Sequence, residues 1–285
     1  MLESLPPWFL PLFAFLFGAL VGSFLNVVIA RVPRGMSIVH PRSRCPGCET
    51  PIASYDNVPI LSWILLKGKC RSCGIRISPR YPFVELAVAL LAVAVVRHFG
   101  ATWWALAAFA FVCALVALTY IDLDHWLLPR SITIPFIVLG LCASLLPGGP
   151  GIVSAAMGAA AGFAAFVVLG FVAERILKKE ALGGGDVWLL SMIGAWLGLR
   201  ALLPVVLLAS LQGALIGGLL LAIARRRQQT TALPPPKPTG DAEVDDWVPP
   251  EGAVPFGPFL ALGAAEYLFF GERLVAWYLG LLTGG

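Results

Sequence analysis

Two aspartates in apolar surroundings are the residues of this sequence best suited to catalysis. Asp122 lies near the end of one apolar segment, and Asp186 directly precedes another. A carboxylate at membrane depth is energetically costly and is a functional-site hypothesis by default. Two carboxylates within hydrogen-bond reach share one proton, so the ionised group can activate water while the protonated group donates to a carbonyl oxygen. The pair predicts a membrane-embedded aspartic protease.

Three consecutive glycines, Gly183, Gly184 and Gly185, come directly before Asp186. Glycine costs backbone entropy wherever it is ordered, so a row of three indicates that something approaches this backbone closely. A protease holds its scissile segment extended, commonly by main-chain pairing, and we therefore predict that the glycines form the substrate-approach loop. The alternative is that each aspartate only caps a helix or anchors an interface.

Asp124 competes with Asp122 for the first catalytic position. Residues two apart in a helix point about 200° away from each other, so these two carboxylates cannot both face Asp186. Periodicity alone leaves the choice between them open.

Four cysteines form a second candidate site. Cys45 and Cys48 make one C-x2-C pair, and Cys70 and Cys73 make another after an interval of 21 residues. Two such pairs are typical of one tetrahedral zinc, which would be structural because protein fills all four positions. The alternatives are two disulfides or idle thiols. Disulfides are rare in the reducing cytosol, where the charge pattern described below places these residues.

The composition indicates which elements position these groups. Of the 285 residues, 59% are hydrophobic, and the mean hydropathy is +0.86. We therefore expect an all-α polytopic membrane protein with about eight transmembrane helices and a small cytoplasmic zinc-binding loop. The eight apolar segments are residues 8–30, 82–97, 102–121, 132–147, 151–173, 187–199, 201–224 and 256–282. The sixth is short. The last contains Glu266, Gly271, Glu272 and Arg273, so we expect either a broken helix or a span followed by an interfacial turn.

The positive charges predict the orientation. If the N-terminus is outside, all 20 lysines and arginines except Arg97, Arg200 and Arg273 lie in cytoplasmic segments. Both aspartates then lie at the cytoplasmic face. The predicted organisation is a first transmembrane helix (1–30), a four-cysteine cytoplasmic loop (31–81) and a transmembrane peptidase bundle (82–285). A proline-rich stretch at 228–255 is expected to be a flexible cytoplasmic connector.

Several stretches in this order resemble the type IV prepilin leader peptidase/N-methyltransferase family, and the resemblance covers nearly the whole chain. They are the two cysteine pairs and residues 22–33, 80–86, 121–125, 183–186 and 255–263. By this resemblance Asp122, rather than Asp124, is the first catalytic aspartate and Asp186 the second. Two positions depart from the family pattern: Trp188 stands where a lysine is usual, and Arg130 where an acidic or amide residue is usual.

The resemblance implies two activities and a bacterial cytoplasmic (inner) membrane location. One removes the short basic leader of type IV pilins and type II secretion pseudopilins after a glycine, on the cytoplasmic side. The other methylates the new N-terminal residue from S-adenosylmethionine. No nucleotide-binding motif shows a methyl-donor site, so the residues that bind this cofactor stay unknown. The partners implied are these precursors and the lipid bilayer, with no nucleic acid.

Two other functions compete with this one. A carboxylate-dependent proton or cation transporter would use Asp122, Asp186 and Glu266, but it predicts repeat symmetry and broken helices near the bilayer midplane. The aspartates lie at the membrane rim, and the sequence shows no convincing repeat. A zinc-bearing membrane scaffold leaves the three glycines unexplained.

Overall fold

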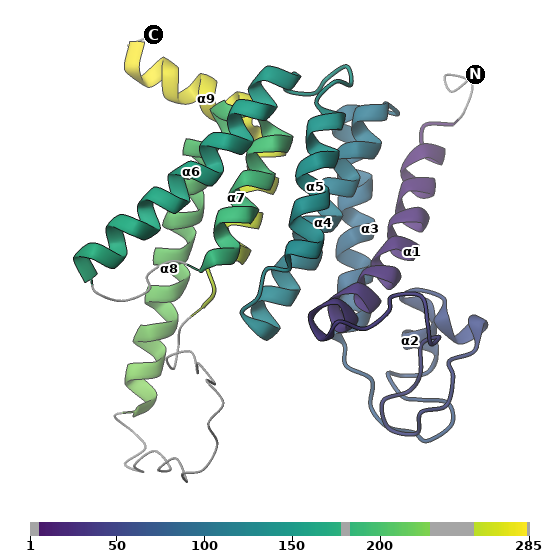
Figure 1. The fold of residues 1–285 in the computed structure, drawn as a ribbon. Coiled ribbons are helices and arrows are strands. Elements are labelled where there is room, and N and C mark those ends of the chain that lie inside the picture. Colours follow the sequence, from purple (N-terminus) through teal and green to yellow (C-terminus); the bar gives the residue numbers. More distant parts are fainter. Residues whose placement is uncertain (1–5, 178–182, 229–253, 284–285) are drawn as a thin grey trace.

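The chain folds into long helices that run in alternating directions (Figure 1). The computed structural model describes residues 6–177, 183–228 and 254–283. The long helices are α1 (Phe9–Arg31), α3 (Arg80–Phe99), α4 (Trp103–His125), α5 (Arg130–Ala143), α6 (Ile152–Leu177), α7 (Gly184–Leu197), α8 (Leu202–Gln228) and α9 (Gly257–Thr283). Within the described ranges β structure is limited to two isolated bridges, Arg44 with Pro51 and Lys69 with Arg76.

Five helical segments are long and apolar enough to cross a membrane by length and composition. They are Phe9–Arg34, Arg80–Phe99, Trp103–His125, Ile152–Ile176 and Leu199–Leu220. This confirms the predicted all-α polytopic class. A helix of about 20 apolar residues can cross a bilayer because it satisfies its backbone hydrogen bonds internally.

The remaining predictions about the helices have mixed outcomes. The sixth segment is short, as expected, because α7 has 14 residues. For the last segment, the broken-helix alternative is wrong, because α9 runs without interruption from Gly257 to Thr283. The Glu266 carboxylate inside α9 accepts a hydrogen bond from the Gln212 side chain at 2.6 Å, which satisfies the polar group without breaking the helix. The predicted connector lies almost entirely outside the described residues.

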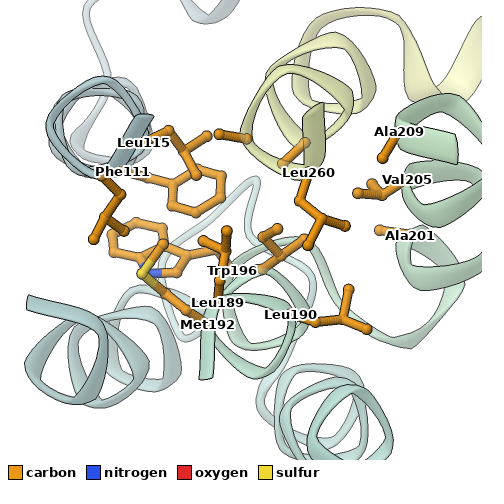
Figure 2. Packing of buried hydrophobic residues seen from close by; sticks show 14 of the residues in the cluster. Phe111, Leu115, Leu189, Leu190, Met192, Trp196, Ala201, Val205, Ala209 and Leu260 are labelled. Carbon is orange, nitrogen blue, oxygen red and sulfur yellow. The ribbon is translucent and has the colours of Figure 1, made fainter. Parts of the chain in front are cut away.

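Two clusters of buried side chains hold the bundle together. One lies between α1, α3 and α4, with Val84, Val95 and Ile121 fully buried. The other joins α4 to α5, α7, α8 and α9, and Figure 2 shows it around Trp196 and Phe111, whose stacked rings have centroids 5.0 Å apart. Helix α4 contributes to both clusters, so it fixes the position of α1 and α3 relative to the helices that follow it.

Helix α7 lies with its backbone directly against α6. A β-carbon on Gly158 would collide with the carbonyl of Gly194, and one on Gly194 would collide with the carbonyl of Gly158. Small residues allow membrane helices to approach this closely, and dispersion contacts then hold them without a hydrophobic driving force. The seam fixes the position of α7 along α6, and therefore the position of the residues at the start of α7.

The segment between α1 and α3 is an irregular loop with one short α-helix, α2 (Leu61–Leu65), and two 3-10 helices, Val32–Arg34 and Ser54–Asn57. In Figure 1 this loop lies beyond the lower end of α1. The Trp63 indole donates a hydrogen bond to the carbonyl of Ile77 at 3.1 Å, and the Glu85 carboxylate accepts one from the Ile60 amide at 2.7 Å. The loop is therefore connected to the first turns of α3.

Candidate active site and metal centre

The structure brings Asp122 and Asp186 together from two helices. Asp122 is the fourth residue from the end of α4, and Asp186 is the third residue of α7. Both are buried, with exposed fractions of 5% and 8%. The two carboxylates lie within range of each other's charge. Two acids that reach hydrogen-bond distance can share one proton, which is what general acid and general base catalysis by the pair requires.

The first residue of α9 covers the Asp122 side of the pair. The backbone of Gly257 hydrogen-bonds the Asp122 carboxylate, and a β-carbon at this position would collide with Asp122 Oδ2. Leu128 packs beside it, within 3.2 Å of where that β-carbon would lie and within 2.8 Å of the corresponding position on Gly185. Gly257 and Leu128 thus close the site from α9 and from the α4–α5 connection.

Asp124 occupies a different environment from Asp122. Its carboxylate forms an ion pair with Arg80 at 2.7 Å, and the Arg80 guanidinium also lies 4.6 Å from the centre of the Tyr120 ring. The Asp124 side chain is 34% exposed. The geometry separates the two aspartates that helical periodicity left as alternatives: Asp122 is buried beside Gly257 and within range of the charge on Asp186, and Asp124 faces the start of α3.

The three glycines lie at the entrance to α7, with Gly183 and Gly184 exposed. A β-carbon on Gly184 would meet no atom within 4 Å, whereas one on Gly183 would lie 3.3 Å from Asp186 Oδ2. The Gly183 carbonyl accepts a hydrogen bond from the Asp186 amide at 3.0 Å. The backbone beside Asp186 is thus accessible from outside.

The four cysteine thiols Cys45, Cys48, Cys70 and Cys73 converge. Their sulfur atoms all lie within 4.8 Å of one another, and Cys45 Sγ and Cys73 Sγ are 3.7 Å apart. Sulfur atoms on the corners of a tetrahedron with metal–sulfur bonds of about 2.3 Å are about 3.8 Å apart, so this set could hold a metal ion.

The two cysteine turns have the same backbone pattern. The amide of Cys45 donates to Thr50 O and that of Cys70 to Ile75 O, five residues on in each turn. Hydrogen bonds from the side chain and then the backbone of Thr50 lower the pKa of the Cys48 thiol to about 6, which favours the thiolate that a metal requires.

Arg130 and Trp188, the two departures from the family pattern, contact each other. The Arg130 guanidinium lies 5.7 Å from the centre of the Trp188 ring, and that ring also packs edge-on against Phe163 at 5.1 Å. A cation over an indole face is a favourable contact that joins the first residue of α5 to the first turns of α7.

Sequence reasoning missed Gly257, Leu128 and the Arg80–Asp124 pair. Residues 255–263 carried the family resemblance, but nothing in one sequence shows that their first helical residue lies against Asp122. Nothing in the sequence indicates that Arg80 pairs with Asp124, because the two residues lie 44 positions apart.

Comparisons with known proteins agree with these observations. Residues 16–99 match the model of the bacterial peptidase A24 N-terminal domain, and residues 109–218 match that of the type IV leader peptidase family. A prepilin leader peptidase/N-methyltransferase of Myxococcus xanthus is 41% identical, with 99% of this chain and 98% of the relative covered. Proteins of the same name from Aeromonas hydrophila and Stutzerimonas stutzeri are 39% and 35% identical, over 96% and 93% of this chain and 95% and 92% of their own lengths. No solved structure matches the chain. With both family models matched and relatives of this identity aligned from end to end, the chain belongs to the type IV leader peptidase family.

Proposed function

We propose that this chain removes the leader peptide of prepilins and pseudopilins and N-methylates the residue it exposes, with Asp122 and Asp186 as the catalytic acids of the peptidase. The observation that carries the peptidase assignment is the burial of both carboxylates at one end of the bundle, one on α4 and one on α7. The names of the relatives supply both activities, and the geometry supplies a site for the first.

The pair can complete peptide hydrolysis by proton transfer alone. The ionised aspartate takes a proton from water as the water oxygen bonds to the scissile carbonyl carbon, and the protonated aspartate gives its proton to the carbonyl oxygen. In the second step one aspartate recovers a proton from the new hydroxyl group while the other protonates the departing nitrogen, and the C–N bond breaks. The pair ends with one proton, as it began.

Gly183, Gly184 and Gly185 are proposed to receive the scissile segment. Their backbone lies next to Asp186, and Gly184 has open space where a side chain would be. An extended substrate can therefore pair with this backbone and place its scissile carbonyl at the carboxylates. This use of the glycines also separates the peptidase from the transporter hypothesis, which requires no accessible backbone beside a carboxylate.

The four cysteines Cys45, Cys48, Cys70 and Cys73 are proposed to hold a structural zinc ion. The 3.7 Å sulfur separation fits tetrahedral zinc, and all four positions are filled by the chain, which leaves none for substrate or water. The loop has little buried apolar surface of its own, so metal binding would supply much of its folding free energy.

S-adenosylmethionine would supply the methyl group for the second activity. A cavity of about 660 Å³ at the other end of the bundle is lined by apolar residues such as Phe13, Phe17 and Trp103. It offers no charged side chain for the sulfonium or the amino-acid part of this cofactor, so it does not fit the methyl donor. We assign no residue of the chain to that role.

The proposed location is the bacterial inner membrane, with the cysteine loop and the aspartate pair in contact with the cytoplasm. The lysine and arginine distribution supports this orientation, because basic residues are retained on the cytoplasmic side. The substrate would then meet the site on the side where its basic leader is synthesised.

Leader removal from a pilin precursor in detergent, followed as a gel shift, tests the peptidase assignment. We expect Asp122→Asn and Asp186→Asn each to lower the rate by a factor of about 10³ or more, since each removes one proton-transfer group. Asp124→Asn is the matched control and should retain most of the activity, because its side chain is partly exposed and faces Arg80.

Metal content and thermal unfolding of each variant establish that the fold is intact. Near-normal cleavage by either Asp122→Asn or Asp186→Asn would contradict the assignment. So would a loss of activity in Asp124→Asn that equals the loss in Asp122→Asn.

A further inference from the structure

Helix α2 presents its apolar side chains outwards. Leu61, Ile64 and Leu65 lie on one face at helical spacing, and they are 53%, 58% and 71% exposed. The inner side carries Trp63, which is half-buried and donates a hydrogen bond to the carbonyl of Ile77 at 3.1 Å, and Ser62, which is buried and donates to the carbonyl of Tyr55 at 3.1 Å. A surface helix in water exposes mainly polar residues, whereas α2 exposes its three aliphatic residues. The surroundings of the outer face of α2 are therefore apolar.

The contact with Glu85 fixes the depth of α2. The Ile60 amide, directly before α2, donates to Glu85 Oε2 at 2.7 Å, and Glu85 is the sixth residue of α3. At 1.5 Å per residue, Glu85 lies about 7.5 Å along α3 from Arg80. Helix α3 has 20 residues, about the length that spans the hydrocarbon layer, so the start of α2 lies within about 7.5 Å of the end of that layer.

Helix α3, to which α2 is attached through Glu85, has a lipid-facing surface on its far side. Phe83 and Leu90 on α3 are 63% and 55% exposed, as expected of side chains that contact acyl chains. Lys67 and Lys69 follow α2 directly, and both are exposed. An apolar face next to basic residues is typical of helices that lie in the plane of an anionic membrane surface, with the apolar face about 5–10 Å below the headgroups.

We infer that α2 is an interfacial membrane anchor: Leu61, Ile64 and Leu65 insert among the lipids of the anionic cytoplasmic leaflet, and Lys67 and Lys69 lie at the headgroups. The four-cysteine loop is thereby held against the bilayer surface, attached both to α3 and to lipid. This contact does not depend on the proposed peptidase activity, so a negative result for either leaves the other standing.

Fluorescence quenching by brominated lipids tests the anchor. The full chain carries an environment-sensitive fluorescent amino acid in place of Leu65, and a matched chain carries it in place of Tyr55, which is 69% exposed on the same loop. The Tyr55 ring lies beside Arg71, whose guanidinium pairs with Asp56, so this position belongs to the aqueous side of the loop. Both proteins are reconstituted in nanodiscs that contain anionic lipid.

We expect acyl-chain bromination to lower the emission of the probe at 65 at least about twofold and to leave the probe at 55 nearly unchanged. Retention of the bound metal shows that the labelled loops are folded. Equal emission of the probe at 65 in brominated and ordinary lipid overturns the inference. Protection of that probe from aqueous iodide without quenching by bromine also overturns it, because a protein surface would then cover the face.

Discussion

At Gly257 the volume of a β-carbon is occupied by the carboxylate of Asp122. The backbone of this residue also hydrogen-bonds that carboxylate, so the glycine both admits and orients it. Any larger residue must displace the proposed catalytic group or the start of α9. The requirement is steric, and it is specific to the residue at this position.

Gly257→Ala should therefore slow leader removal by roughly 10- to 100-fold, because small displacements of a reacting group are costly. Gly218→Ala is the matched control, since a β-carbon on Gly218 in α8 meets no atom within 4 Å. Initial rates for the two purified variants provide the comparison. Equal rates would show that Asp122 tolerates displacement, contrary to the proposed geometry.

The two cysteine turns differ at one equivalent residue. Four positions after the first cysteine, one turn has Gly74 with φ of 71° and the other has Glu49 with φ of 54°. A left-handed backbone costs a residue with a β-carbon about 1 kcal/mol relative to glycine. Glu49 therefore bears a local strain that Gly74 does not.

Glu49→Gly should raise the apparent zinc affinity of the loop roughly fivefold, and Gly74→Ala should lower it by a similar factor. The space beside Gly74 is open, so its substitution tests backbone strain without a collision. Competition with a chromophoric chelator measures both changes. A decrease for Glu49→Gly would show that the glutamate side chain stabilises the turn.

Among the elements, α3 connects the cysteine loop to the aspartate site. Its first residue, Arg80, pairs with Asp124 beside the end of α4, and its sixth, Glu85, binds the backbone that precedes α2. The Arg80–Asp124 pair is about one-third exposed, so it contributes position more than stability. The loop and the catalytic end of α4 thus share one helix as a support.

Removal of the metal should unfold the loop and spare the membrane helices. Chelator-treated protein is expected to be cleaved by trypsin at Lys67, Lys69 or Arg71, while its helical circular dichroism changes by less than about 5%. Cys45→Ser should behave like the chelated protein, and Cys142→Ser, outside the cluster, should behave like the parent chain. Resistance of the chelated loop to trypsin would contradict a metal-dependent fold.

Hydropathy predicted the long helices because each span must cross about 30 Å of hydrocarbon. This requires a run of about 20 apolar residues, which is easily recognised in a sequence. Helix α2 was missed because its five residues are too few for a periodic pattern. The broken helix considered for the last segment was wrong, since α9 is continuous, and Gln212, on α8, donates a hydrogen bond to Glu266 inside it. A polar residue in an apolar segment indicates that a hydrogen-bond partner is required, and only the fold shows which residue is that partner.

The same distinction applies to the candidate site. Residue types predicted two aspartates and four cysteines, and the cysteine spacing alone predicted their convergence. The choice between Asp122 and Asp124 depended on resemblance, because helical periodicity allows either aspartate to face Asp186. Gly257 could not be recognised, since its role exists only after α9 packs against α4.

For the molecule as a whole, the orientation in the membrane decides which compartment the aspartates face. Alkaline phosphatase, which requires disulfides, should be active when fused after Pro147, between α5 and α6, and inactive when fused after Gln228, at the end of α8. Phosphatase assays on intact cells measure both fusions. The opposite pattern would place the aspartates and the cysteine loop outside the cytoplasm.

Helices α5 and α7 have 14 residues each, and both begin at the end of the bundle where the aspartates lie. Such a helix is about 21 Å long, well short of a typical hydrocarbon layer of about 30 Å. Lipids beside a short span respond by thinning, so the bilayer should be thinner next to α5, whose Val138 and Leu139 are exposed, whereas α7 is enclosed by its neighbours. Thinning on the cytoplasmic side shortens the distance that solvent must travel to reach the carboxylates. A short helix at the catalytic end would therefore also bring water, the second reactant of hydrolysis, closer to the aspartates.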